Sequence, residues 1–204
     1  MKRNVFAVAV GAALALNAFS AFAESSSAAG GAGASTSANL DFRLTIPKFL
    51  RLQVGTTGAT IDRIDFTPTV SQLATAPSTV VSGTAASGDL GNGSVTVSVQ
   101  ANPNADTVNL TYTTTASALS DGGTNTVPWS TIKVATSGAD AASLGHPAAL
   151  ADGSAGDVNV VAPLPVTAGV INLSAIWTYT WDDAGTIYPA ATYNGRVAYK
   201  IATP

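Results

Sequence analysis

The side chains that carry hydrolytic or transfer chemistry are scarce in this sequence. It has a single histidine, His146, and no cysteine, and its aspartates stand mostly in turn-forming stretches. Such reactions need a nucleophile beside a base, paired carboxylates or a metal cluster. His146 precedes Pro147 in a Gly/Ala-rich stretch, which favours a solvated loop residue over a catalyst. We therefore expect no enzyme activity, no catalytic residue and no cofactor.

Two acidic stretches either hold an ion or form turns. Residues 152–157, DGSAGD, together with Asp140, offer oxygen atoms of the kind that Ca²⁺ binds, but they lack the spaced carboxylates and closing Glu of a dedicated loop. Asp182 and Asp183 precede Gly185, where a tight turn explains them. Turn formation is the favoured interpretation of both stretches. No metal site is predicted, and calcium at the first stretch stays open.

The sharpest local pattern is WTYTW at residues 177–181. In a strand, Trp177, Tyr179 and Trp181 share one face, so they could form a flat platform on which a glycan stacks. They could equally be the inner face of a β-structure, with the two threonines turned to solvent. The core interpretation is favoured because the chain has few other large residues for its core. The platform is the best alternative binding site.

A second pattern follows a stretch of small residues that can hardly fold. Residues 24–38, ESSSAAGGAGASTSA, have the composition of a flexible linker. The next residues alternate apolar and polar side chains with the two-residue period of a half-buried strand, the apolar ones being Leu40, Phe42, Leu44 and Ile46. This strand completes either its own core or the core of a neighbouring molecule.

The chain begins like a secreted protein. Lys2 and Arg3 precede an apolar run that ends at Ala21-Phe22-Ala23, which is the layout of a signal peptide over residues 1–23. No later segment is apolar and long enough to cross a bilayer. The chain has 9 basic and 12 acidic residues, which argues against a nucleic-acid partner. Without cysteine, the secreted fold must be held by its core rather than by disulfides.

Short strand candidates separated by Gly, Pro, Asn or Asp fill the rest of the chain. They predict a single antiparallel β-sandwich or barrel domain over residues 39–204. The expected strands are 40–46, 49–54, 61–66, 79–82, 94–101, 107–114, 130–135, 158–162, 170–181 and 193–201.

The last of these candidates carries a resemblance to a known group. It alternates Tyr193, Gly195, Val197, Tyr199 and Ile201 with polar or small residues, and Tyr188-Pro189 precedes it. This ending resembles that of bacterial secreted pilin-like β-sandwiches, the group of spore coat protein U and the chaperone–usher fimbrial subunits. The signal peptide and the all-β pattern are similar too, whereas the cysteine pair common in these families is absent.

The resemblance implies an immunoglobulin-like sandwich that lacks its final strand and receives one from the next subunit. The acceptor edge would then lie beside residues 193–201, and the donor would be residues 40–46. Strand addition combines main-chain hydrogen bonds with alternate side chains in pockets. The implied partners are copies of the chain or related pilin subunits, with a periplasmic chaperone and an outer-membrane usher.

These observations predict a non-catalytic structural subunit of a fimbria, exported through the periplasm to the bacterial cell surface, where fimbriae serve adhesion and biofilm formation. Two alternatives stay open. Residues 40–46 and 49–54 could be the split first strand of a self-complete sandwich. The protein could also be a secreted module that binds a glycan.

Overall fold

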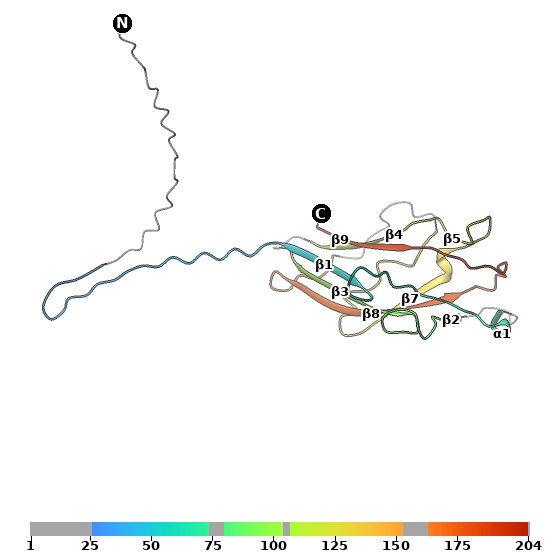
Figure 1. Cartoon of the computed structure of the whole chain (residues 1–204), viewed down its shortest axis with the longest axis horizontal. Coiled ribbons are helices and arrows are strands. Elements are labelled where there is room, and N and C mark those ends of the chain that lie inside the picture. The colour runs from blue at the N-terminus through green and yellow to red at the C-terminus, as the bar shows by residue number, and fades with distance from the viewer. Residues whose placement is uncertain (1–25, 74–79, 104–106, 153–162, 204) are drawn as a thin grey trace, which may run out of the picture. The chain divides into compact units, whose positions relative to one another are not determined.

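The computed structural model of the chain describes residues 26–73, 80–103, 107–152 and 163–203 (Figure 1). It divides between Ile46 and Pro47 into two compact units, which are described here one at a time. In the first unit, residues 26–46 carry neither helix nor strand, so the strand predicted at 40–46 is not formed. The second unit starts at Pro47. The predicted signal peptide, 1–23, lies outside the described residues.

The regular secondary structure of the second unit is almost entirely β-strand. Every strand pairing among its described residues is antiparallel, which confirms the all-β class. The strands are β1 (Phe49–Val54), β2 (Val80–Ser82), β3 (Ser94–Asn102), β4 (Asn109–Thr114), β5 (Leu119–Ser120), β6 (Thr126–Val127), β7 (Ile132–Ser137), β8 (Ile171–Asp182) and β9 (Val197–Ala202). The helical turns are α1 (Val70–Leu73) and η1 (Trp129–Thr131), and no helix in the described ranges is long and apolar enough to cross a membrane.

The largest sheet has five strands, and β8 is its longest strand. β8 pairs with β3 through residues 171–178, with β2 through 180–182 and with β7 through 176–181. β1 pairs with β3 and forms an edge of this sheet. β4 and β9 form a separate two-stranded sheet, and β5 pairs with β6.

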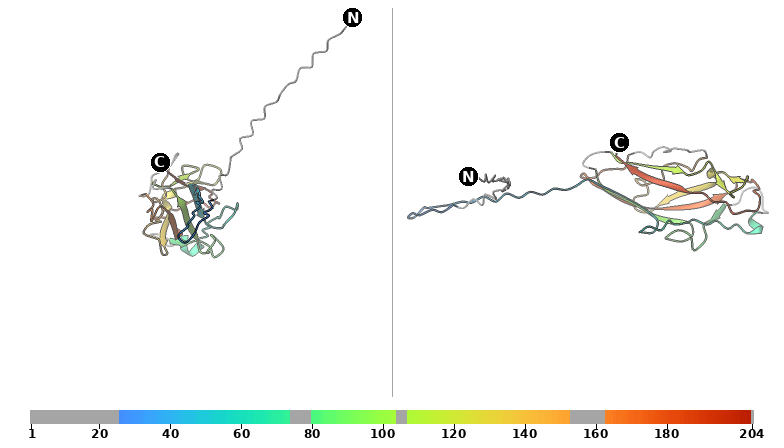
Figure 2. Two further views of the ribbon diagram at one scale, coloured as in Figure 1. Left: turned by 90° about the vertical axis from the view of Figure 1, so that its left-hand side faces the viewer. Right: turned by 45° about the horizontal axis from the view of Figure 1, so that its top comes forward.

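One hydrophobic core joins the five-stranded sheet to the β4–β9 pair. In β3, β-branched valines alternate with Ser and Thr, and the burial alternates with them, so that Val95, Val97 and Val99 point inward. β4 contributes Leu110 and Tyr112 from the opposite side. Figures 1 and 2 show β4 and β9 on one side of the core and β3 and β8 on the other.

The remaining strand predictions mostly agree with the structure. Residues 61–66 form no strand, because their backbone makes only scattered bonds, such as those from the N–H groups of Thr84 and Gly88 to the carbonyls of Asp65 and Arg63. The last strand starts at Val197 instead of residue 193. The strand predicted at 158–162 falls outside the described residues.

Candidate functional site

β1 presents an open edge. Within the described part of the chain it pairs with β3 alone, so its other edge forms no ladder with a second strand. Its inward side chains, Leu52 and Val54, are only partly buried, although their register partners on β3, Val99 and Val97, are both 0% exposed. The core is therefore well covered under β3 and incompletely covered under β1.

β9 shows the same asymmetry. It pairs with β4 alone among the described strands. Its inward side chains, Val197, Tyr199 and Ile201, are partly buried, whereas the residues opposite them on β4 are buried. Among the described residues, no second strand pairs with β9 to cover this inward face.

The two open edges belong to one region of the molecule. Cα atoms of β1 and β9 come within 8 Å of each other, and Figures 1 and 2 show the strands closest where β1 begins and β9 ends. The partly buried side chains of both strands pack against the same core cluster. We call this region, β1 with β9, the open edge.

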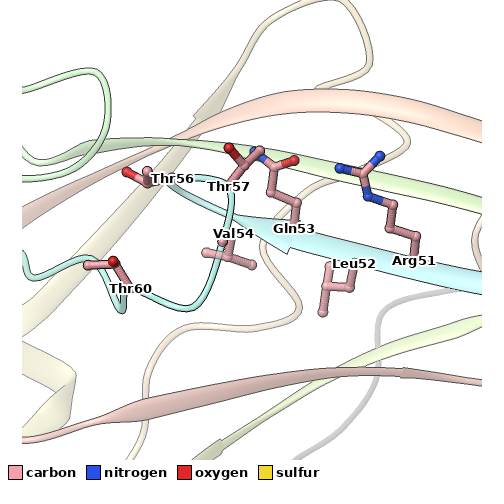
Figure 3. A pocket seen from close by; sticks show the side chains of 8 residues that line it. Arg51, Leu52, Gln53, Val54, Thr56, Thr57 and Thr60 are labelled. Atoms are coloured by element: carbon pink, nitrogen blue, oxygen red, sulfur yellow. The ribbon is translucent and has the colours of Figure 1, made fainter.

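A cavity of about 290 Å³ runs along β1. It is lined by Arg51, Leu52, Gln53, Val54, Thr56, Thr57, Gly58 and Thr60. Figure 3 shows Leu52 and Val54 pointing to one side of the strand and Arg51 and Gln53 to the other. Because side chains of both faces line the cavity, it lies beside the strand rather than under one face.

The loop after β1 lines part of this cavity and is held by hydrogen bonds to a side chain. The Asp62 carboxylate accepts hydrogen bonds from the backbone N–H and, at 2.9 Å, from the hydroxyl of Thr56. Gly55 has a φ of +78°, and a Cβ there would lie 1.8 Å from Asp62 Oδ2. These residues were not among the predicted ones, since a Thr/Gly-rich loop after a strand carries no distinctive signal in the sequence.

The residues predicted to donate a strand are uncovered. Leu40, Phe42, Leu44 and Ile46 are exposed by 76%, 89%, 84% and 67%. All four side chains of the apolar face that the alternation predicts are therefore exposed. Four large apolar side chains in an alternating run are typical of a segment that binds a partner.

Of the five predicted acceptor residues, three lie on β9, and Tyr193 and Gly195 lie before it. Tyr193 donates its hydroxyl to the Pro189 carbonyl at 2.7 Å, and Asn194 bridges to Ser120. Gly195 lies against Trp129. These residues guide the chain into β9 rather than forming part of its edge.

Tyr199 also belongs to a polar network that the sequence did not predict. His146 Nε2 lies 2.8 Å from the Tyr199 hydroxyl, which lies 2.8 Å from the Tyr179 hydroxyl. His146 Nδ1 lies 2.5 Å from the Ala148 carbonyl. The His146 ring stands 4.8 Å from that of Trp177 and 5.5 Å from that of Tyr112, centroid to centroid. The prediction that His146 is a solvated loop residue is therefore wrong.

Burial shifts the pKa of each group in this network. It lowers the pKa of His146 from 6.5 to about 4, because the charged ring loses its hydration. It raises the pKa of Tyr179 to about 12 and that of Tyr199 well above 10. All three groups are therefore neutral at pH 7, and nothing in their arrangement makes a nucleophile.

The predicted glycan platform is not a surface. Trp177 is 0% and Tyr179 is 7% exposed, since both point from β8 into the core, and the Trp177 indole donates to the Leu144 carbonyl at 3.1 Å. Trp181 is partly buried, with its ring 6.3 Å from that of Tyr188. The three side chains share one face of β8, and it is the inner face, as the favoured core interpretation predicted.

The acidic stretches form turns and local contacts. Asp140 accepts from the Ser174 N–H at 2.8 Å, and Asp152 accepts from the Trp129 N–H, so the two carboxylates serve different partners. Asp182 and Asp183 accept from the N–H groups two residues on, as turn-forming Asp does. No group of metal-ligating side chains occurs in the described ranges, and Asp157 lies outside them.

Comparison of the chain with protein-family models, curated proteins and solved structures gives no match.

Proposed function

We propose that this protein is a non-catalytic structural subunit of a bacterial extracellular filament, in which residues 40–46 of one copy add a strand to the open edge of the next. One pair of features carries the proposal. The core is incompletely covered at β1 and β9, and the same chain holds an uncovered alternating apolar segment. A strand laid along the open edge would satisfy unpaired backbone groups and cover the apolar side chains of both strands.

The two facing sheets with one unfilled position fit an immunoglobulin-like, pilin-like sandwich that lacks a strand. In such an arrangement the donor is held by main-chain hydrogen bonds, and Leu40, Phe42, Leu44 and Ile46 enter the core. The proposal carries with it export through the periplasm to the cell surface, and a homopolymer or related pilin subunits as partners. A periplasmic chaperone would cover the open edge before assembly, and an usher would pass the subunit outward.

The sequence between donor and β1 favours a neighbouring copy over the same chain. Only Pro47 and Lys48 separate Ile46 from Phe49. To lie antiparallel beside β1 in its own chain, the segment would need a two-residue hairpin, whose turn types require a positive φ at the first position. Proline fixes φ near −65° and forbids this. A parallel arrangement would need a connection of about a dozen residues.

A pair of matched variants tests the proposal. Leu44→Asp places a charge on the apolar face of the donor, and Thr45→Asp places the same charge on the opposite face. Full-length protein is exported, purified and sized by chromatography with light scattering. We expect polymers from the wild type and from Thr45→Asp, and monomers from Leu44→Asp, because a buried unpaired carboxylate is far more costly than an exposed one. Equal sizes for all three proteins would refute the proposal.

A further inference from the structure

β9 is attached to the molecule in two ways. Along one edge it forms its ladder with β4, from the Asn109–Ala202 pair to the Thr114–Val197 pair. Across the core, the Tyr199 side chain reaches β8 through Tyr179 and reaches the 138–150 loop through His146. The second attachment therefore helps to fix the strand whose other edge is open.

The direction of each hydrogen bond in this chain of contacts follows from chemistry. The Ala148 carbonyl can only accept, so His146 Nδ1 carries the proton and donates to it. Nε2 of the neutral ring then accepts from the Tyr199 hydroxyl. The Tyr199 oxygen in turn accepts from the Tyr179 hydroxyl. In the neutral state each donor in this chain has an acceptor.

We propose that His146 is a positioning residue for strand binding, which holds β9 through Tyr199 and makes binding at the open edge sensitive to acid. This inference rests on the proposed function. When Nε2 gains a proton it becomes a donor, and the Tyr199 hydroxyl must turn away from it. Tyr199 then donates toward Tyr179, whose own hydroxyl loses its acceptor. The attachment of β9 across the core is weakened at that point.

Among the described residues, no acidic side chain is found in contact with the His146 ring. The groups that face the ring are the aromatic side chains Tyr112 from β4, Trp177 and Tyr179 from β8, and Tyr199 from β9. On its own loop, the Asp140 carboxylate binds the Ser174 N–H instead. On β7, Thr136 accepts from the His146 backbone N–H, and the Lys133 side chain is exposed.

Strand docking and protonation therefore oppose each other. A strand beside β9 covers the exposed part of Tyr199 and removes water from the hydrogen-bond chain behind it, which makes the charged His146 ring still less favourable. Because coupling between two binding events is reciprocal, the proton must weaken strand binding by the same factor by which the strand lowers the proton's affinity. His146 is the only histidine of the chain, so its titration can be followed without interference.

The test uses full-length protein carrying Leu44→Asp, which leaves the open edge unfilled, and a fluorescent peptide of residues 39–47. Peptide affinity is measured by anisotropy between pH 7 and pH 3.5, wherever tryptophan fluorescence shows folded protein. On acidification, the peptide affinity of the protein with His146 should fall about 3-fold more than that of the His146→Gln variant. The reason is that Gln keeps a hydrogen-bond donor and an acceptor but does not titrate. The His146→Gln variant is expected to bind more weakly at pH 7, with a flatter profile.

Histidine NMR gives the second readout, above the acid limit of folding. Saturating peptide should move the His146 midpoint to lower pH by about 0.5 unit, which is the same ~3-fold coupling. Suppose that the peptide binds at pH 7, that it does not move the His146 midpoint, and that the His146→Gln variant has the same pH profile of affinity as the protein with His146. This result would overturn the inference and leave the proposed function standing. No peptide binding at pH 7 in any variant would overturn both.

Discussion

At the scale of single residues, the Tyr199 hydroxyl links β9 to two other parts of the molecule. It donates to His146 and accepts from Tyr179, and its ring packs 5.0 Å from that of Trp177. Removing this one oxygen leaves the partly buried Tyr179 donor and His146 acceptor without this partner. Such unsatisfied groups cost more than the hydrogen bonds themselves contribute.

Tyr199→Phe should therefore lower the free energy of unfolding by about 1–3 kcal/mol at pH 7, measured by urea denaturation. Tyr193→Phe is the matched control, because the Tyr193 hydroxyl makes only one surface bond, to Pro189. Its expected effect is below about 0.5 kcal/mol. Equal stabilities of the two variants would show that the hydrogen-bond chain does not hold β9.

The sequence could not reveal this network. His146 is 53 residues from Tyr199 and stands among Gly, Pro and Ala, so its local composition indicated a solvated loop. Only the fold brings β8, β9 and the loop together. By contrast, the inward direction of Trp177 and Tyr179 followed from the two-residue period of a strand and from the shortage of other large residues.

At the scale of elements, the entry into β9 depends on a residue without a Cβ. A Cβ at Gly195 would lie 2.5 Å from Trp129 Cζ2 and 2.7 Å from Leu119 Cδ2. Trp129 is 4% exposed, and its indole N–H donates to the Ala116 carbonyl at 2.9 Å. The Trp129 ring is therefore held in place, and only glycine at position 195 fits beside it.

Gly195→Ala should destabilise the protein by about 1–3 kcal/mol through overpacking against Trp129. Gly145→Ala is the control, since the nearest atom to its Cβ would be the Ala141 carbonyl oxygen at 3.7 Å, an ordinary contact. Its effect should stay within about 0.5 kcal/mol. Chemical denaturation of both variants decides the matter, and a Gly195→Ala protein as stable as the control would contradict this packing.

Most strands could be predicted from alternation and turn residues, because β-branched runs such as β3 fit a half-buried pleated surface wherever they pair. The two overestimates, 40–46 and 61–66, share one cause. Alternation shows that a segment can be a strand, but a ladder also needs a free partner edge. Residues 40–46 pair with no strand in the described part of the chain, and residues 63–65 make only scattered bonds.

At the scale of the whole molecule, the chain combines a partly exposed core with an exposed apolar segment. The inward side chains of β1 and β9 are partly exposed, and the 40–46 segment exposes four large apolar side chains. The chain has no cysteine, so no disulfide compensates for the uncovered core. Association between copies would resolve both features through one interface, and it would couple the stability of each subunit to assembly.

The absence of cysteine also permits the most direct measurement, a disulfide between two chains. One chain carries Ala198→Cys on the outward face of β9, and the other carries Asp41→Cys, Arg43→Cys or Thr45→Cys on the polar face of the donor. Neighbouring strands lie about 4.8 Å apart, within disulfide range at the correct register. We predict that one of the three mixtures gives a mixed disulfide between chains on oxidation. The contradicting result is that no mixture gives a disulfide between chains, while a protein that carries Ala198→Cys and a donor cysteine in the same chain forms one within the monomer. Residues 40–46 would then complete their own core and would not serve as a donor to a neighbouring copy.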